Sequence, residues 1–134
     1  MAIEYSYLIA SVIVFIVMIV VQMVGSVSQH GLVSLAGARD HLGADNAFVS
    51  RAKRANQNMI ESFCLFVPVT LVAIASGSAN EMTAMGGGLF LAGRIAYAPL
   101  YWLGVAWLRT LAWTAAFVGI ILILLQVLPF SGAA

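Results

Sequence analysis

Charged residues are scarce in this chain of 134 residues: Asp, Glu, Lys and Arg make up 8% of it, against about a quarter of an average soluble domain. Hydrophobic residues make up 63% of the sequence. This balance excludes an ordinary soluble domain and predicts a protein that lies in a lipid bilayer. The formal net charge is only +1, so the chain lacks the basic surface of a nucleic-acid-binding protein, and we expect no nucleic-acid partner.

Cysteine and histidine are scarce as well. The single cysteine, Cys64, lies inside an apolar run, which excludes a disulfide within the chain. A lone cysteine in such a run is more often a small buried hydrophobe than a catalytic thiol. His30 and His41 both fall in the first polar connection without a matching third ligand, so we expect no metal site.

The N-terminal segment reads as a membrane span that is retained in the mature protein. Its apolar run has no basic residues before it and is longer than the hydrophobic region of a signal peptide, about 7–15 residues. A span needs roughly 20 apolar residues, and the rest of the chain has room for three more. One domain over residues 1–134 is therefore expected, with spans at about 5–25, 46–76, 80–103 and 107–128.

Four spans with mostly short connections predict an all-α, integral membrane four-helix bundle with up-down-up-down order. Basic residues gather beside the connections on one side: Arg39, Arg51, Lys53, Arg54 and Arg109. The opposite side has Glu4 and Glu81 and neither Lys nor Arg. By the positive-inside rule we expect both termini outside the cytoplasm and the long connection, 26–47, within it.

Small residues recur at every fourth position of the third expected span: Ala84, Gly88, Ala92 and Ala96. Such a ridge lets transmembrane helices approach closely. We therefore expect tight packing on this helix, with a partner in the same chain or in a neighbouring copy. Because four thin helices enclose little interior, a homo-oligomer is the natural way to build a site.

The second expected span begins with a stripe of polar side chains. At 100° per residue, Arg54, Asn58 and Glu61 lie within about 60° of one another on the helix. A charged side chain at mid-bilayer costs roughly 2.5–3.5 kcal/mol on insertion scales, so Glu61 has to face protein or a wet cavity. One interpretation is purely structural: Glu61 neutralises Arg54 or Arg94 as a buried bridge between helices.

The third expected span carries a second polar group. Arg94, Tyr97 and Tyr101 share one face through their i, i+3, i+7 spacing, and Arg109 lies at the start of the fourth span. Arginines therefore outnumber the single carboxylate of Glu61 in the cytoplasmic half of the bundle. Because an unpaired buried charge is costly, this excess predicts a cavity that attracts an anion. The expected ligand is a small zwitterion with excess negative charge.

RAKRANQNMIESFCLF, residues 51–66, resembles the second-helix signature of the MAPEG family, the membrane-associated proteins in eicosanoid and glutathione metabolism. The family pattern Arg-Ala-x-x-Asn-x-x-Glu falls here on Arg54, Ala55, Asn58 and Glu61. GRIAYAPLYWLGVAWLRT, residues 93–110, resembles the family's third-helix Arg-x-x-Tyr, a second tyrosine and the fourth-helix arginine, as Arg94, Tyr97, Tyr101 and Arg109. The resemblance covers essentially the whole chain and is to the bacterial-type members of the family.

The resemblance implies a homotrimer in the bacterial inner membrane, with glutathione bound between adjacent subunits in a cleft open to the cytoplasm and to the lipid. It implies seven glutathione-binding residues: Arg39, Arg54, Asn58, Glu61, Arg94, Tyr97 and Tyr101. It also implies that Arg109 stabilises the thiolate, so that the nucleophile is the glutathione sulfur rather than Cys64. Two positions depart from the family: Asn56 replaces a histidine of many members, and Ser62 replaces a tyrosine of some.

Three interpretations of function follow from these residues. The first is a glutathione-dependent transferase, with or without peroxidase activity, that acts on lipophilic electrophiles dissolved in the bilayer. The second is an epoxide isomerase on the same scaffold, with or without haem. The third is a non-catalytic membrane protein whose polar stripe only specifies assembly. The two tyrosines also fit an interfacial aromatic belt with Trp102 and Trp107, although their shared face with Arg94 favours the site.

Overall fold

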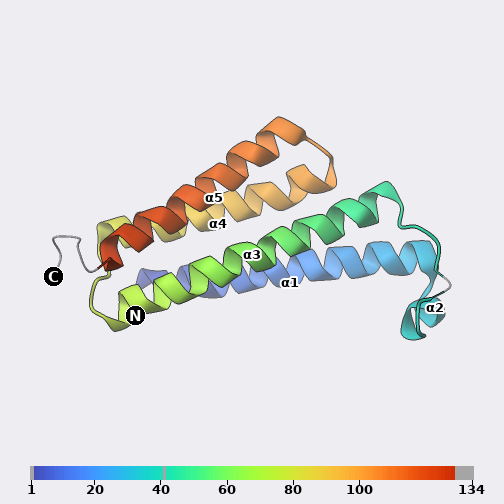
Figure 1. Cartoon of the computed structure of the whole chain (residues 1–134), viewed down its shortest axis with the longest axis horizontal. Helices are drawn as coiled ribbons and strands as arrows, with labels where there is room; N and C mark the ends of the chain where they lie inside the picture. The colour runs from blue at the N-terminus through green and yellow to red at the C-terminus, as the bar shows by residue number, and fades with distance from the viewer. Residues whose placement is uncertain (1, 41, 129–134) are drawn as a thin grey trace.

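The computed structural model describes residues 2–40 and 42–128, and within these ranges every regular element is an α-helix. The elements are α1 (Ile3–His30), α2 (Leu32–Ala36), α3 (Ala47–Ala75), α4 (Glu81–Trp102) and α5 (Ala106–Val127). The four long helices run back and forth, so the start of α1 and the end of α5 lie at the same end as the α3–α4 turn (Figure 1). The predicted all-α fold class is confirmed for the described residues.

Three of the described helices, α1, α3 and α5, are long and apolar enough to cross a membrane. Four spans were expected from the sequence, but α4 falls short on composition rather than on length. It has 22 residues, and three consecutive glycines, Arg94 and two tyrosines lower its mean hydropathy. A helix of this composition belongs against protein, and α4 does bury Arg94 and Tyr97.

Local sequence explains where the helices begin and end. The side chain of Asn46 caps α3 by accepting a hydrogen bond of 2.9 Å from the Val49 N–H. Asn80 caps α4 in a reciprocal capping box with Thr83. Helix α1 continues past the expected end at residue 25 and stops at His30, where the following Gly31 adopts a φ of 85°.

Among the described helices, α4 and α5 contact each other most extensively. A Cβ atom added to Gly86 would lie 2.5 Å from the carbonyl oxygen of Gly119, and one added to Gly93 would lie 2.6 Å from that of Ala112. No side chain fits at these positions, so the two backbones touch because glycine lacks a Cβ. The expected tight packing of this helix is therefore present, and its partner is α5 of the same chain.

The residues of α4 that make this contact are not those of the expected small-residue ridge. Ala92 and Ala96 are exposed, whereas the contacting residues of α4 are Gly86 and Gly93. Positions four apart rotate by 40° per step around a helix, so a long four-residue series drifts off one face. Positions seven apart return to within 20°, which keeps Gly86 and Gly93 on the face toward α5.

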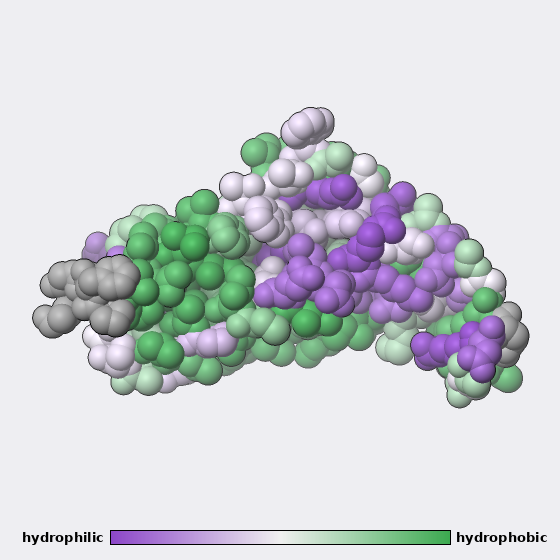
Figure 2. All heavy atoms as spheres, in the orientation of Figure 1, coloured by the Kyte–Doolittle hydropathy of each residue, from purple (hydrophilic) through white to green (hydrophobic). Residues whose placement is uncertain are grey.

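Helix α3 packs against α1, α4 and α5, and α1 also packs directly against α4 (Figure 1). The ring of Phe66 stacks on that of Phe90 of α4, with centroids 3.8 Å apart. Met18, Met59 and Tyr97 belong to a second cluster of buried side chains. Hydrophilic residues gather in the half of the molecule nearer the α4–α5 turn, and hydrophobic residues cover the other half (Figure 2). The core therefore leaves a polar region where α3, α4 and α5 meet.

Candidate functional site

Arg94 lies at the bottom of this polar region and is completely buried. Its Nη1 donates a hydrogen bond of 2.7 Å to Asn58 Oδ1, and its Nε lies 3.1 Å from the sulfur of Met59. The guanidinium carbon lies 4.2 Å from the centre of the Tyr97 ring. Its Nη2 has no hydrogen-bond partner among the described residues. A buried cation with an idle donor favours an anion beside it, because an unpaired buried polar group is costly.

Tyr101 connects two further arginines to this position. Arg54 Nε donates a hydrogen bond of 3.1 Å to the Tyr101 hydroxyl, and the Arg109 guanidinium lies 4.4 Å from the centre of the Tyr101 ring. The rings of Tyr101 and Tyr97 are 5.5 Å apart, so the two tyrosines join all three cations. Cation–π contacts of this kind hold guanidinium groups in place without neutralising their charge.

A cleft of about 350 Å³ opens where these side chains meet. Its lining residues come from α3, α4 and α5: Asn58, Tyr97, Tyr101, Arg109, Thr110 and Trp113. Four of them, Asn58, Tyr97, Tyr101 and Arg109, belong to the set of site residues expected from sequence, whereas Arg54 and Arg94 lie beside the cleft and do not line it. A volume of this size lies within the range of small-molecule sites, roughly 300–1,000 Å³.

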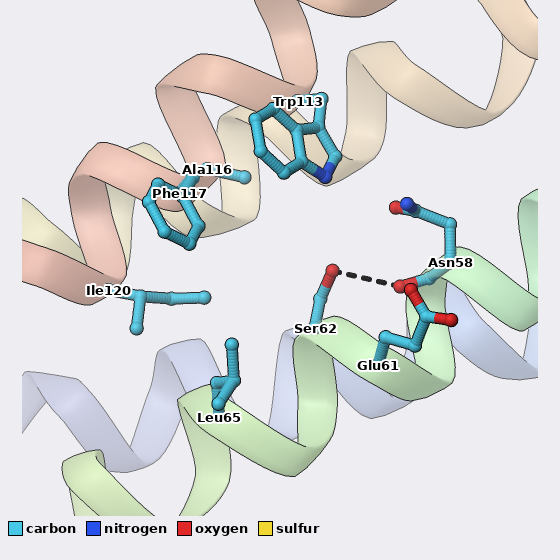
Figure 3. A pocket seen from close by; sticks show the side chains of 8 residues that line it. All are labelled: Asn58, Glu61, Ser62, Leu65, Trp113, Ala116, Phe117 and Ile120. Carbon is cyan, nitrogen blue, oxygen red and sulfur yellow. Dashed lines mark hydrogen bonds between the residues drawn. The ribbon is translucent and has the colours of Figure 1, made fainter.

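Glu61 does not neutralise any of the arginines. Its side chain is exposed, and the ion pairs of the described residues join only Asp45 to His30 and to Lys53. Glu61 instead lines a smaller slot beside the cleft (Figure 3). The interpretation of Glu61 as a buried bridge to Arg54 or Arg94 is therefore wrong for the single chain, and the positive charge of the cleft stays unbalanced.

Arg39 lies apart from the cleft. Its Nε donates a hydrogen bond of 2.7 Å to the carbonyl oxygen of Leu35, at the end of α2. It lines a separate cavity of about 290 Å³, formed mainly by α1 and by the connection to α3. The structure therefore does not bring Arg39 together with the other expected site residues within one chain.

Asp45 ties the end of α1 to the start of α3. Its two carboxylate oxygens lie 2.7 Å from Lys53 Nζ and 3.0 Å from His30 Nε2. The hydrogen bond from Lys53, followed by that from His30, holds the pKa of Asp45 below its usual value of 3.8. His30, which was expected in the first connection, is the last residue of α1, and His41 lies outside the described residues.

Two contacts in the site were not expected from the sequence. Trp113 lines the cleft, and its position four residues after Arg109 places it on the same side of α5, a signal that the sequence does contain. Met59 contacts Arg94 through its sulfur, but an apolar residue in an apolar helix gives no signal of this kind. Cys64, expected to be buried, is exposed, because it points away from the buried side chains of Ser62 and Phe66.

The fold and the cleft define an all-helical integral membrane protein with arginines gathered around a polar cavity. The chain belongs to the MAPEG family: the sequence model of that family matches residues 6–129, nearly the whole chain. No curated protein and no solved structure matches the chain. Membership in the family supports, in broad terms, a membrane-bound function related to glutathione.

Proposed function

We propose that this protein is a glutathione-dependent transferase that activates the glutathione thiol for attack on lipophilic electrophiles. The observation that carries the proposal is the excess of positive charge in and beside the cleft. Arg109 lines the cleft, Arg54 and Arg94 adjoin it through Tyr101 and Asn58, and none of the three pairs with a carboxylate of the described residues. Glutathione has two carboxylates and one ammonium, and its thiol becomes a further negative charge on ionisation. A ligand of this charge supplies what the cleft lacks.

The binding roles follow from the position of each side chain. The idle Nη2 of Arg94 donates to a glutathione carboxylate, while Asn58 and Tyr97 hold the guanidinium in place. Arg54, which is exposed apart from its bond to Tyr101, binds the second carboxylate. Glu61, exposed beside Asn58 at the edge of the cleft, accepts a hydrogen bond from the ammonium.

Arg109 stabilises the thiolate. Its guanidinium lines the cleft from α5 and packs on Tyr101, which keeps it close to the bound tripeptide. A free cysteine thiol ionises near pH 8.5, and a neighbouring arginine lowers that pKa, so more of the bound glutathione is thiolate at neutral pH. The thiol proton leaves to solvent, the sulfur forms a bond to the electrophilic carbon, and the leaving group departs with the electron pair.

The same proposal includes assembly as a homotrimer with glutathione between adjacent subunits and the cleft toward the cytoplasm. The position of Arg39 supports this assembly, because Arg39 belongs to the proposed glutathione-binding residues but lines a different cavity from the cleft of its own chain. A neighbouring subunit would supply its own Arg39 to the cleft and complete the set. Closed symmetric assemblies commonly build sites of this kind at their interfaces.

The test is rapid mixing of the detergent-purified protein with glutathione, followed by ultraviolet absorbance of the thiolate. The wild type should form thiolate near neutral pH. Arg109→Ala should bind glutathione without forming thiolate. The absence of both thiolate and glutathione binding in the wild type would overturn the proposal and favour a non-catalytic membrane protein.

A further inference from the structure

Three side chains contact the guanidinium group of Arg94, and each does so in a different way. Nη1 donates a hydrogen bond of 2.7 Å to Asn58 Oδ1, and the guanidinium carbon lies 4.2 Å from the centre of the Tyr97 ring. Nε donates to the sulfur of Met59 over 3.1 Å. Asn58 and Tyr97 already belong to the proposed site, whereas Met59 has no role in it.

Met59 reaches Arg94 because it directly follows Asn58 on α3. Consecutive residues of an α-helix point about 100° apart, so the two side chains approach the arginine of α4 from two directions. Contact with the face of a ring leaves a guanidinium group free to turn in its own plane. Two hydrogen bonds from its N–H groups fix that rotation, because such bonds weaken steeply when they bend. Asn58 and Met59 together therefore set the direction in which Nη2 points.

The chemistry of a thioether suits this position. The sulfur of Met59 is a weak and uncharged acceptor, so it gives the Nε–H of Arg94 a partner without neutralising the positive charge. A carboxylate in the same place would cancel that charge. Leucine would leave the Nε–H without a partner, and solvent could not replace the sulfur, because Met59 and Arg94 are both completely buried.

The contact with Met59 also decides which donors of Arg94 remain for a ligand. Arginine can hold a carboxylate through two parallel N–H···O bonds, and Nε is often one of the donors. Here Nε already donates to Met59, and Nη1 donates to Asn58. Nη2 has two N–H groups and no partner among the described residues. An anion beside Arg94 therefore binds through Nη2 rather than through Nε.

We propose that Met59 is a positioning residue, whose sulfur holds the Arg94 guanidinium so that Nη2 receives one particular carboxylate of glutathione. This assignment rests on the proposed glutathione function. Met59 lines neither the cleft nor the slot, so it acts through Arg94 and not by touching the ligand. Its effect is therefore confined to one of the two carboxylates of the tripeptide.

The test measures the binding of three ligands to the detergent-purified, full-length protein by calorimetry. The ligands are glutathione, an analogue esterified at the glycyl carboxylate, and an analogue that lacks the α-carboxylate of the γ-glutamyl residue. Met59→Leu should weaken the binding of glutathione about two- to twelvefold, the range of one hydrogen bond. It should weaken one analogue by the same factor. The other analogue, which lacks the carboxylate that Arg94 binds, should keep its wild-type affinity.

Two further variants serve as control and as rescue. Met18→Leu makes the same chemical change at a second buried methionine of the same cluster, and it should bind all three ligands as the wild type does. Met59→Gln places an amide oxygen near Nε of Arg94 and should keep the wild-type preference for glutathione over the insensitive analogue. If Met59→Leu does not fold, loss of this preference in a folded Met59→Gln variant overturns the assignment.

The outcomes separate the role of Met59 from the function on which it rests. An equal loss for all three ligands in Met59→Leu would overturn the assignment, because a structural defect weakens every ligand alike. Unchanged affinity for all three would overturn it as well. In both cases the glutathione function stands, provided that the wild type binds glutathione. Failure of the wild type to bind glutathione overturns the proposed function itself.

Discussion

Asn58 and Arg94 face each other across the boundary between α3 and α4, and the amide oxygen of Asn58 accepts a hydrogen bond of 2.7 Å from Arg94 Nη1. A carboxylate in this place would cancel the charge of the arginine, whereas an amide satisfies one donor and leaves the charge intact. The positive potential of the cleft therefore depends on the choice of asparagine at this position.

Substitution of Asn58 should separate folding from binding. Asn58→Leu leaves the buried Arg94 Nη1 without its partner, so we expect a loss of about 1.5–3 kcal/mol of stability, the usual worth of a hydrogen bond to a charged group. Asn58→Asp should be more stable than Asn58→Leu and should bind glutathione more weakly than the wild type, because the carboxylate neutralises Arg94. Thermal unfolding in detergent and calorimetric titration with glutathione measure the two effects. Tighter binding by Asn58→Asp would contradict the charge argument.

Gly93→Ala should destabilise the protein although alanine is the better helix former. A Cβ at this position would lie 2.6 Å from the Ala112 carbonyl oxygen and 2.9 Å from the Ala116 nitrogen, so the backbones of α4 and α5 must separate. Overpacking of this kind costs about 1–3 kcal/mol, more than the roughly 1 kcal/mol that helix propensity returns. Gly43→Ala, which meets nothing within 4 Å, serves as control. Equal melting temperatures for the two variants would rule out the close α4–α5 contact.

The stabilising effect of Asp45 should depend on pH. Because its pKa is lower in the folded protein than the usual 3.8, its contribution to stability is complete above that value and is lost as the pH falls through the folded pKa. The difference in melting temperature between the wild type and Asp45→Asn should therefore be constant near neutral pH and shrink below about pH 4. Parallel melting curves of the two proteins across this range measure it, and a difference that grows on acidification would have the wrong sign.

Mixed trimers test whether Arg39 reaches the cleft of a neighbouring subunit. Arg39→Ala and Arg109→Ala should each lose most thiolate formation, but trimers that contain both variants should regain about one site in three, since each site draws one residue from each of two subunits. If both residues served the same chain, no subunit in the mixture would carry an intact site and no activity would return. Ultraviolet absorbance of the thiolate in co-expressed, doubly tagged trimers distinguishes these results.

Cys64→Ser should leave the reaction unchanged. Cys64 is the only cysteine of the chain, is exposed on α3 and lines neither the cleft nor the slot. Surface substitutions usually change free energies by no more than about 0.5 kcal/mol, so thiolate formation should stay within about a factor of two. A larger loss would assign a role to this thiol in place of the glutathione sulfur.

The helices were predictable because apolar runs of about 20 residues admit few other structures in a bilayer. The polar residues of α3 and α4 were predictable as one group for a related reason: Arg94 is too costly to place in lipid, so its i+3 and i+7 neighbours share its protein-facing side. Their spacing fixed which residues of each helix belong to the site, and the structure brings Arg54, Tyr97 and Tyr101 together with Arg94.

Contacts between helices were less predictable, because they depend on relative rotation and on separation. The four-residue ridge at Ala92 and Ala96 gives a correct expectation of close packing but the wrong face. Glu61 shares a stripe with Arg54 on α3, yet sharing a helix face does not set the distance to Arg94 on another helix. Residue spacing along a helix predicts the position of Trp113 just as it predicts that of Tyr101. It does not predict the role of Met59, because the contact of the Met59 sulfur with Arg94 depends on where α4 lies.

The backbone contact at Gly86 and Gly119 has a mechanical consequence. Where two helix backbones touch directly, no side chain between them can change its rotamer and let the helices shift. We therefore expect α4 and α5 to move as one rigid unit that carries both Arg94 and Arg109. The cleft and the slot then widen only when the α4–α5 unit rotates relative to α3. Spin labels at Ile95 and Val118 should keep their separation when glutathione binds, while the distance from either label to one at Val72 changes.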